Sequence, residues 1–273
     1  MLNESLVKYL AGLLDADGSM SFSFKEDQNR EGLFFTGLRL MLASSKAVDR
    51  HGFVESLPEL TRMGSISHYG ASRQFVTWTV NRRSEVEMLT PRLIKHMIIK
   101  AHHWQWMLDM WRTMRSHSNT CTASDRILLV QAGKESRRNN RGPLKPKNHP
   151  SWAWLAGYLD GDGCYTHRQN PGTKNGKTYL QWTINVSAVA HINDQAVLQF
   201  LQMAFGGQIR DHGKSPNVKV WVRSLGNQNR SFALNFLSKL ARHARLKRHK
   251  IDQMIHHHQQ RLSVPSAEAQ AIV

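Results

Sequence analysis

A pair of acidic residues ends each copy of a repeated nonapeptide. Residues 10–18 read LAGLLDADG and residues 155–163 read LAGYLDGDG, and the last acids, Asp17 and Asp162, lie 145 residues apart (162 − 17). Each segment has the apolar spacing of a helix, and the C-terminal end of a helix carries partial negative charge. Carboxylates at that end of a helix are unfavourable unless a cation compensates their charge. Carboxylate oxygens bind Mg²⁺, and a bound divalent cation can activate water for phosphodiester hydrolysis.

The small residues of the nonapeptides predict how these acids are brought together. Ala11 and Gly12 leave room for a second backbone to approach the helix closely. The simplest partner is the other copy of the nonapeptide. Two such helices, packed along a pseudo-twofold axis, would place Asp17 beside Asp162 at their C-terminal ends.

Both nonapeptides are followed by segments in the same serial order, which predicts the elements that position the acids. Alternation of apolar and polar residues marks strands, and a spacing of three or four marks helices. In the first half we expect strands at 19–25, 38–42, 65–69 and 73–81 and helices at 48–57 and 89–114. In the second half we expect strands at 180–186, 208–212 and 218–224 and helices at 193–205 and 229–262. Thr90 and Pro91 are placed to begin the last helix of the first half.

Each half therefore reads αββαββα. The repeat predicts an α+β fold, a pseudo-twofold tandem of two such units with two antiparallel β-sheets. The basic, proline- and glycine-containing stretch 133–151 is expected to be a linker between an N-terminal repeat, residues 1–132, and a C-terminal repeat, residues 152–273.

The composition favours a polyanionic partner. The chain has 37 Lys and Arg against 20 Asp and Glu, a net charge of +17, so double-stranded DNA or RNA is expected rather than a membrane. Two cysteines are too few for a disulfide framework, and the chain has no long apolar run and no basic leader. We expect an intracellular protein, in the cytoplasm, the nucleoid or an organelle matrix, that is not secreted.

The two nonapeptides and the repeated unit resemble the LAGLIDADG homing endonucleases, in particular the monomeric type that carries two motifs. The resemblance covers nearly the whole chain. It implies that Asp17 and Asp162 bind the catalytic metal, Mg²⁺ with Mn²⁺ or Ca²⁺ as substitutes, and that Asp15 and Asp160 have a structural or supporting role. It also implies a single chain, encoded in an intron or free-standing, that cuts both strands of DNA.

The family places a lysine near the start of the long C-terminal helix of each half. Lys100 and Lys247 match this position, 83 residues after Asp17 (100 − 17) and 85 after Asp162 (247 − 162). The resemblance therefore implies that both lysines polarise the attacking water or stabilise charge in the transition state.

The two sheets are expected to form a saddle whose solvent-exposed faces contact base edges in the major groove of DNA. Alternation along the strands assigns the following residues to DNA binding: Ser21, Ser23, Lys25, Arg39, Gln74, Thr77, Thr166, Arg168, Asn170, Gln181, Thr183, Asn185, Arg210, His212, Lys219 and Arg223. The two sets differ, so we expect a long asymmetric target.

Two other functions fit the same sequence. An RNA maturase on this scaffold would bind its host intron RNA and assist splicing. A DNA-binding regulator would have kept the fold and lost cleavage, although the intact acids Asp17 and Asp162 argue against it.

Overall fold

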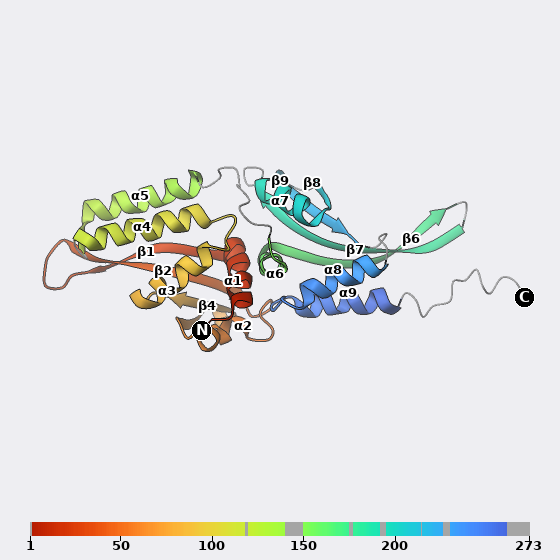
Figure 1. Cartoon of the computed structure of the whole chain (residues 1–273), viewed down its shortest axis with the longest axis horizontal. Coiled ribbons are helices and arrows are strands. Elements are labelled where there is room, and N and C mark those ends of the chain that lie inside the picture. Colours follow the sequence, from red (N-terminus) through yellow and green to blue (C-terminus); the bar gives the residue numbers. More distant parts are fainter. Residues whose placement is uncertain are drawn as a thin grey trace, which may run out of the picture.

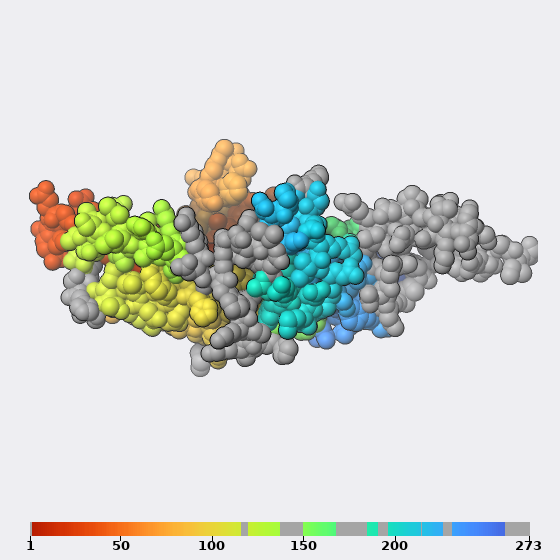
Figure 2. Space-filling view, turned by 90° about the horizontal axis from the view of Figure 1, so that it is seen from above, coloured from red at the N-terminus to blue at the C-terminus, as the bar shows by residue number. Residues whose placement is uncertain are grey.

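The fold is described from a computed structural model that covers residues 2–117, 120–139, 150–174, 177–191, 195–213, 215–225 and 230–260. These residues form two repeats that lie side by side along the long axis of an elongated molecule (Figures 1 and 2). Each repeat contains an antiparallel sheet and the order αββαββα, followed by further helix. The predicted fold class is therefore confirmed.

The first repeat is built on one sheet with strand order β1-β2-β4-β3, to which a short strand, β5, adds beside β2. Its elements are α1 (Glu4–Asp17), β1 (Gly18–Glu26), β2 (Leu33–Ser45), α2 (Phe53–Thr61), β3 (Ser65–Tyr69), β4 (Phe75–Val80), α3 (Arg83–Ile94), α4 (Ala101–His117), β5 (Thr120–Thr122) and α5 (Ala123–Asn139). A 3₁₀ turn, Ala71–Arg73, connects β3 to β4.

The second repeat has the equivalent strand order, β6-β7-β9-β8. Its elements are α6 (Trp152–Asp162), β6 (Gly163–Lys174), β7 (Lys177–His191), α7 (Gln195–Phe205), β8 (Gln208–His212), β9 (Ser215–Ser224), α8 (Arg230–Ala241) and α9 (Arg248–Gln260). In both repeats the motif helix passes directly into the first strand, so that the last acid of the motif stands where the sheet begins.

The two repeats meet along the motif helices α1 and α6, which lie side by side at the centre of the molecule (Figure 1). A Cβ atom built at Gly12 would lie 2.0 Å from the carbonyl oxygen of Trp154, and one built at Gly157 would lie 2.0 Å from the carbonyl oxygen of Tyr9. These distances are far too short for any side chain. The expected pairing of the two nonapeptides through their small residues is thus observed, and it follows a pseudo-twofold axis.

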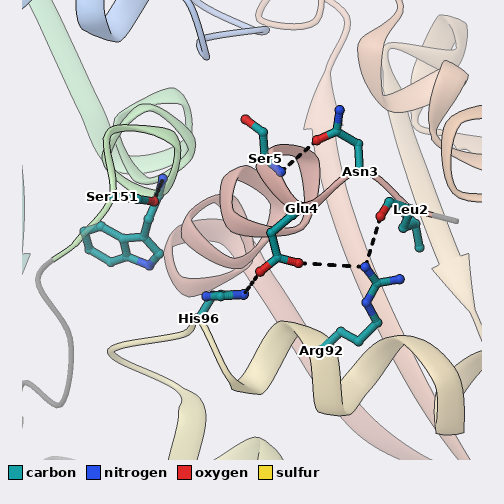
Figure 3. A network of polar contacts seen from close by, with 8 residues as sticks. Leu2, Asn3, Glu4, Ser5, Arg92, His96 and Ser151 are labelled. Carbon is teal, nitrogen blue, oxygen red and sulfur yellow. Dashed lines mark hydrogen bonds and ion pairs between the residues drawn. The ribbon is translucent and has the colours of Figure 1, made fainter.

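The start of α1 is fixed by polar contacts (Figure 3). The Asn3 side chain accepts a hydrogen bond of 2.8 Å from the Ser5 backbone and caps the helix. Glu4 lies 2.7 Å from the ring of His96, and Arg92 donates to the Leu2 carbonyl at 3.0 Å. These contacts tie α1 to the segment that leads from α3 to α4.

The long helices expected at 89–114 and 229–262 are each broken in two, and this corrects the sequence prediction. The first helix begins earlier, at Arg83, so Thr90 is buried inside α3 and Pro91 lies in its last turn. Residues 95–100 then separate α3 from α4, and residues 242–247 separate α8 from α9. Periodicity cannot reveal these breaks, because apolar residues continue through them.

A helix that the sequence pattern did not indicate, α5, packs beside α4. It continues to Asn139 and so includes the first residues of the predicted linker. Leu129 is its buried contact, and Arg126 lies over the rings of Phe24 and Phe34 at 5.5 and 5.3 Å. The domain bounds themselves stay a prediction, since residues 140–149 lie outside the described part of the chain.

Candidate active site

Asp17 and Asp162 end the two central helices, on the side where both sheets begin. Both side chains are exposed. A Cβ atom built at Gly161 would lie 2.9 Å from the Asp17 carboxylate and 2.5 Å from Cβ of Ala16, so the last turns of α1 and α6 are in contact. The structure thus brings the two predicted acids together at one point on the molecular axis.

The electrostatic environment of this pair raises the pKa of both acids. Loss of water around the crossing helix ends is the largest cause for each. The charge of Asp17 raises the pKa of Asp162 further, while Lys100 and Lys247 act in the opposite direction on both acids. The acids therefore interact with each other and with lysines of both repeats.

Asp15, the first acid of the first motif, is buried and holds the segment between α3 and α4. Its carboxylate accepts backbone hydrogen bonds from Ile98 at 2.7 Å, Ile99 at 3.2 Å and Lys100 at 2.8 Å. It also accepts a hydrogen bond of 2.9 Å from the indole nitrogen of Trp154 in α6. Burial raises the pKa of Asp15, although the three backbone donors and the indole favour its charged form.

Asp160 has the same arrangement in the second repeat. Its carboxylate accepts backbone hydrogen bonds from Arg245 at 2.7 Å, Leu246 at 3.0 Å and Lys247 at 3.0 Å. The hydroxyl of Tyr9 in α1 donates to it at 2.8 Å. The structural role expected for Asp15 and Asp160 is therefore specific: each acid orders the loop that carries the lysine of its own repeat.

Lys100 and Lys247 directly precede α4 and α9. The Nζ atom of Lys100 donates to the carbonyls of Leu14, Ala16 and Gly18 at 3.0, 2.8 and 2.8 Å. Lys247 donates to those of Leu159, Gly161 and Gly163 at 3.1, 2.7 and 2.7 Å. Each ammonium group thus lies against the C-terminal end of its own motif helix.

Lys100 and Lys247 supply part of the positive charge that compensates the carboxylates at the helix ends, a role that the sequence pattern had suggested for a metal ion. A cation at the C-terminus of a helix interacts favourably with the helix dipole, and each ammonium group donates to carbonyls at that end. Burial lowers the pKa of Lys247, and Asp160 and Asp17 partly oppose this. The two sites therefore combine a half-buried cation with an exposed carboxylate.

The donor set at the helix ends suits a hard cation. Among the described residues no group of three or more His, Cys, Asp or Glu could hold a metal by itself. Asp17 and Asp162 offer oxygen ligands only, and loss of water at the helix ends is the main cause that raises the pKa of both carboxyl groups. Mg²⁺ commonly takes one or two carboxylates and completes its shell with water and substrate phosphates, so these residues fit it.

The sheet faces beside the helix ends carry most of the residues predicted to bind DNA. In the first sheet the core face is formed by residues such as Met20, Leu40 and Trp78, which are buried. By strand register the opposite face, here called the reading face, carries Ser21, Ser23, Lys25, Arg39 and Thr77. Thr77 is only 9% exposed there.

On the second reading face the register places Thr166 opposite Asn185, and Arg168, Asn170, Gln181 and Thr183 fall on the same side of β6 and β7. The side chains of the last four residues lie outside the described part of the structure. Arg210 is exposed on this face, and His212 is half-buried at the irregular end of β8.

Three of the predicted DNA-binding residues lie elsewhere. Trp221 is fully buried, so it faces the core. Lys219 and Arg223 lie two positions away from Trp221 on either side and therefore face the core as well, whereas the valines between them face outward. Lys219 pairs with Asp211, and Arg223 lies over the ring of Phe232 at 4.8 Å.

Gln74 precedes β4, which begins at Phe75, so it lies outside the strand on which alternation placed it. Its carbonyl accepts a hydrogen bond of 2.9 Å from the Lys46 backbone. Gln74 and Thr77 differ by three positions and could not have shared one face of a strand.

The aromatic donors Tyr9 and Trp154 are site residues that the sequence argument missed. They occupy equivalent positions, one turn and a half before the first acid of each motif, and each donates to the acid of the other repeat. The available signal was that both positions of the repeat carry an aromatic residue with a polar hydrogen.

Comparisons with known proteins agree with this geometry. Residues 155–251 match the sequence model of the LAGLIDADG endonuclease family. A search of curated proteins gave no match. This stretch of the second repeat is thus similar to that family, which agrees with the resemblance found in the sequence.

Solved structures extend the likeness to the whole chain. The meganuclease I-AabMI bound to uncleaved DNA is 16% identical with a TM-score of 0.65, and the match covers 94% of this chain and 91% of that one. I-GzeII in complex with its DNA target is 13% identical with a TM-score of 0.64 and coverage of 100% and 96%. I-SmaMI bound to cleaved DNA is 17% identical with a TM-score of 0.61 and coverage of 93% and 87%. The whole chain therefore has the fold of the LAGLIDADG meganucleases.

Helices of the described residues are too short or too polar to cross a bilayer.

Proposed function

We propose that this protein is a site-specific homing endonuclease that hydrolyses both strands of a long, asymmetric DNA target and acts as a single chain. One observation carries the proposal: two exposed carboxylates, Asp17 and Asp162, stand together at the ends of paired helices, each beside a lysine held by its own loop. One such centre per repeat matches the two strands of a duplex.

The carboxylates of Asp17 and Asp162 would hold divalent cations, Mg²⁺ in the first instance. Such cations would supply an activated water and neutralise charge on the leaving oxygen. Among the similar structures, I-SmaMI is bound to an uncleaved DNA target in the presence of calcium ions. Ca²⁺ should therefore support binding of the target by this chain, and Mg²⁺ or Mn²⁺ should support cleavage.

Lys100 and Lys247 would stabilise charge at the reacting phosphates. Each ammonium group is fixed by three carbonyls and by the loop that Asp15 or Asp160 orders, so it is preorganised. Because burial lowers the pKa of Lys247, its ammonium group gives up a proton more readily than that of an exposed lysine.

The two reading faces would lie in the major groove on either side of the helix ends. Ser21 and Arg39 are half-buried on the first reading face, and the hydroxyl and guanidinium groups are donors that base edges in the major groove accept. The faces carry different residues, so the two halves of the target should differ.

The test uses purified full-length protein and a randomised DNA duplex library with Mg²⁺, followed by sequencing of the cleaved ends. We expect one long asymmetric site and loss of double-strand cleavage in Asp17→Asn and in Asp162→Asn. Asp109→Asn, at an exposed carboxylate of α4 that contacts Gln105 and Arg112, is the matched control and should cut like the original protein.

Binding of DNA without any cut end in Mg²⁺ or Mn²⁺ would refute the nuclease proposal. A regulator is then the better description. The maturase alternative predicts that the protein accelerates splicing of an intron RNA, and that this activity survives Asp17→Asn, since splicing needs no DNA cleavage.

A further inference from the structure

The reading face of the second sheet carries valines at its centre. Val186 and Ala188 face the core, so Val189 points to the reading face, where it is 40% exposed. Trp221 is fully buried, so its neighbours Val220 and Val222 also point to the reading face, where both are half-buried.

These three residues form one cluster. Val189 is paired with Val220 across β7 and β9, and Val222 is the diagonal neighbour of Val189 because it pairs with Ser187. We call Val189, Val220 and Val222 the valine cluster.

The equivalent positions of the first repeat are small or polar. Trp78 donates its indole hydrogen to the Met63 carbonyl at 3.0 Å, and Trp221 donates to the Gly206 carbonyl at 2.8 Å, so the two tryptophans correspond. Thr77 is therefore equivalent to Val220, and Thr79 to Val222. Ala43, which pairs with Thr77, is equivalent to Val189.

The surroundings of the valine cluster are polar and basic. Arg210 is paired with Val220 on β8, is exposed, and holds the Gln208 side chain at 3.2 and 2.5 Å. Thr166 and Asn185 pair with each other on the side of the valine cluster that leads to the hairpin between β6 and β7. An apolar cluster of three residues inside such a face is too small for a protein or lipid partner, but it matches the size of one or two base edges.

The major groove presents one apolar group, the C5 methyl of thymine. We propose that the valine cluster recognises thymine methyl groups in the half of the target bound by the second repeat, close to the cleavage centre. This inference rests on the proposed function, because it needs DNA on the reading face. The first repeat has Ala43, Thr77 and Thr79 in these places, which present fewer methyl groups and two hydroxyls, so its preference for thymine would be weaker.

The experiment measures binding in Ca²⁺, where no cleavage is needed. Duplexes selected by the original protein from a randomised library are resynthesised with each thymidine replaced in turn by deoxyuridine, which lacks only the methyl group. We expect about fourfold weaker binding for each contacted methyl at one or two positions of one half-site. Val220→Ser, which removes both methyl groups of the valine, should abolish this difference at the affected positions.

The converse variant is the control. Thr79→Val, at the more exposed of the two threonines, should leave the deoxyuridine effect of the second half-site unchanged and strengthen the thymine preference of the other half-site. Thermal melting of each variant confirms that the fold is kept.

Equal binding of thymidine and deoxyuridine duplexes throughout, or a deoxyuridine effect that persists in Val220→Ser, would overturn the inference and leave the proposed function intact. Absence of DNA binding by the original protein would instead overturn both.

Discussion

The indole nitrogen of Trp154 donates a hydrogen bond of 2.9 Å to the Asp15 carboxylate across the boundary between the two repeats. Tyr9 donates to Asp160 in the opposite direction at 2.8 Å. Each aromatic residue thereby acts on the acid that orders the lysine loop of the other repeat. The two candidate sites are thus coupled through the helix pair, and a change in one repeat should be felt in the other.

The first prediction concerns Tyr9. Its hydroxyl is a donor to a buried carboxylate, and burial together with Asp160 keeps its pKa well above the ordinary value, so it stays protonated. Tyr9→Phe should lower the free energy of unfolding by about 1.5–3 kcal/mol, because Asp160 then loses one hydrogen bond to a charged group. Urea unfolding measures the change.

The control is Tyr69→Phe, since Tyr69 is half-exposed on β3. It should stay within about 0.5 kcal/mol of the original protein. Similar losses in both variants would show that the contact of Tyr9 with Asp160 adds nothing to stability.

The second prediction concerns the closest approach of the two repeats. A Cβ atom at Gly12 would lie 2.0 Å from a backbone oxygen of α6, which cannot move without shifting the helix. Gly12→Ala should therefore destabilise the protein by more than the 1–3 kcal/mol typical of an overpacked core, and should reduce DNA cleavage because the two acids separate.

Gly133→Ala in α5 is the matched control. A Cβ atom there meets nothing nearer than 3.9 Å, so alanine should stabilise the helix by about 0.5–1 kcal/mol. Thermal unfolding of both variants is the measurement, and a tolerated Gly12→Ala would contradict the close packing of α1 and α6.

The acids and the fold could be predicted because they depend on local patterns. The repeat of nine residues placed Asp17 and Asp162, and alternation placed Ser21, Arg39 and Thr166 on the reading faces. The helix breaks could not be predicted, since they depend on a buried carboxylate that captures three backbone donors from a distant segment.

β9 shows why some strand residues were misassigned. Its valines alternate with Lys219, Trp221 and Arg223, so both faces contain apolar residues and two registers fit the pattern. The large indole of Trp221 decides between them, because burying it removes more apolar surface than burying valines does. The aromatic donors Tyr9 and Trp154 were missed because their partners belong to the other repeat.

The third prediction concerns the pKa of Asp162. Burial and the charge of Asp17 raise it above the ordinary value, so protons compete with cations for the site at acidic pH. Cleavage should therefore rise as the pH increases through this raised pKa. Asp17→Asn removes the like charge, so the pKa of Asp162 should fall.

Carbon-detected NMR titration of the aspartate carboxyl groups measures this shift in the metal-free protein. Asp125, whose pKa is lowered by hydrogen bonds from Thr122, serves as the internal reference and should not change. An unchanged pKa of Asp162 in the variant would mean that the two acids are too far apart to interact.

The last prediction separates two arginines that look alike in the sequence. Arg210 is exposed on the reading face, whereas Arg223 lies on the core side of β9, over the ring of Phe232. Arg210→Ala should weaken DNA binding, and if its guanidinium contacts a phosphate the salt dependence should flatten by about one ion. Arg223→Ala should leave the affinity for DNA nearly unchanged and lower the unfolding temperature, since it removes packing under α8.

Fluorescence anisotropy across a potassium chloride series and thermal melting distinguish the two variants. A larger loss of DNA affinity in Arg223→Ala than in Arg210→Ala would reverse the assigned faces of β9 and, with them, the position of the valine cluster.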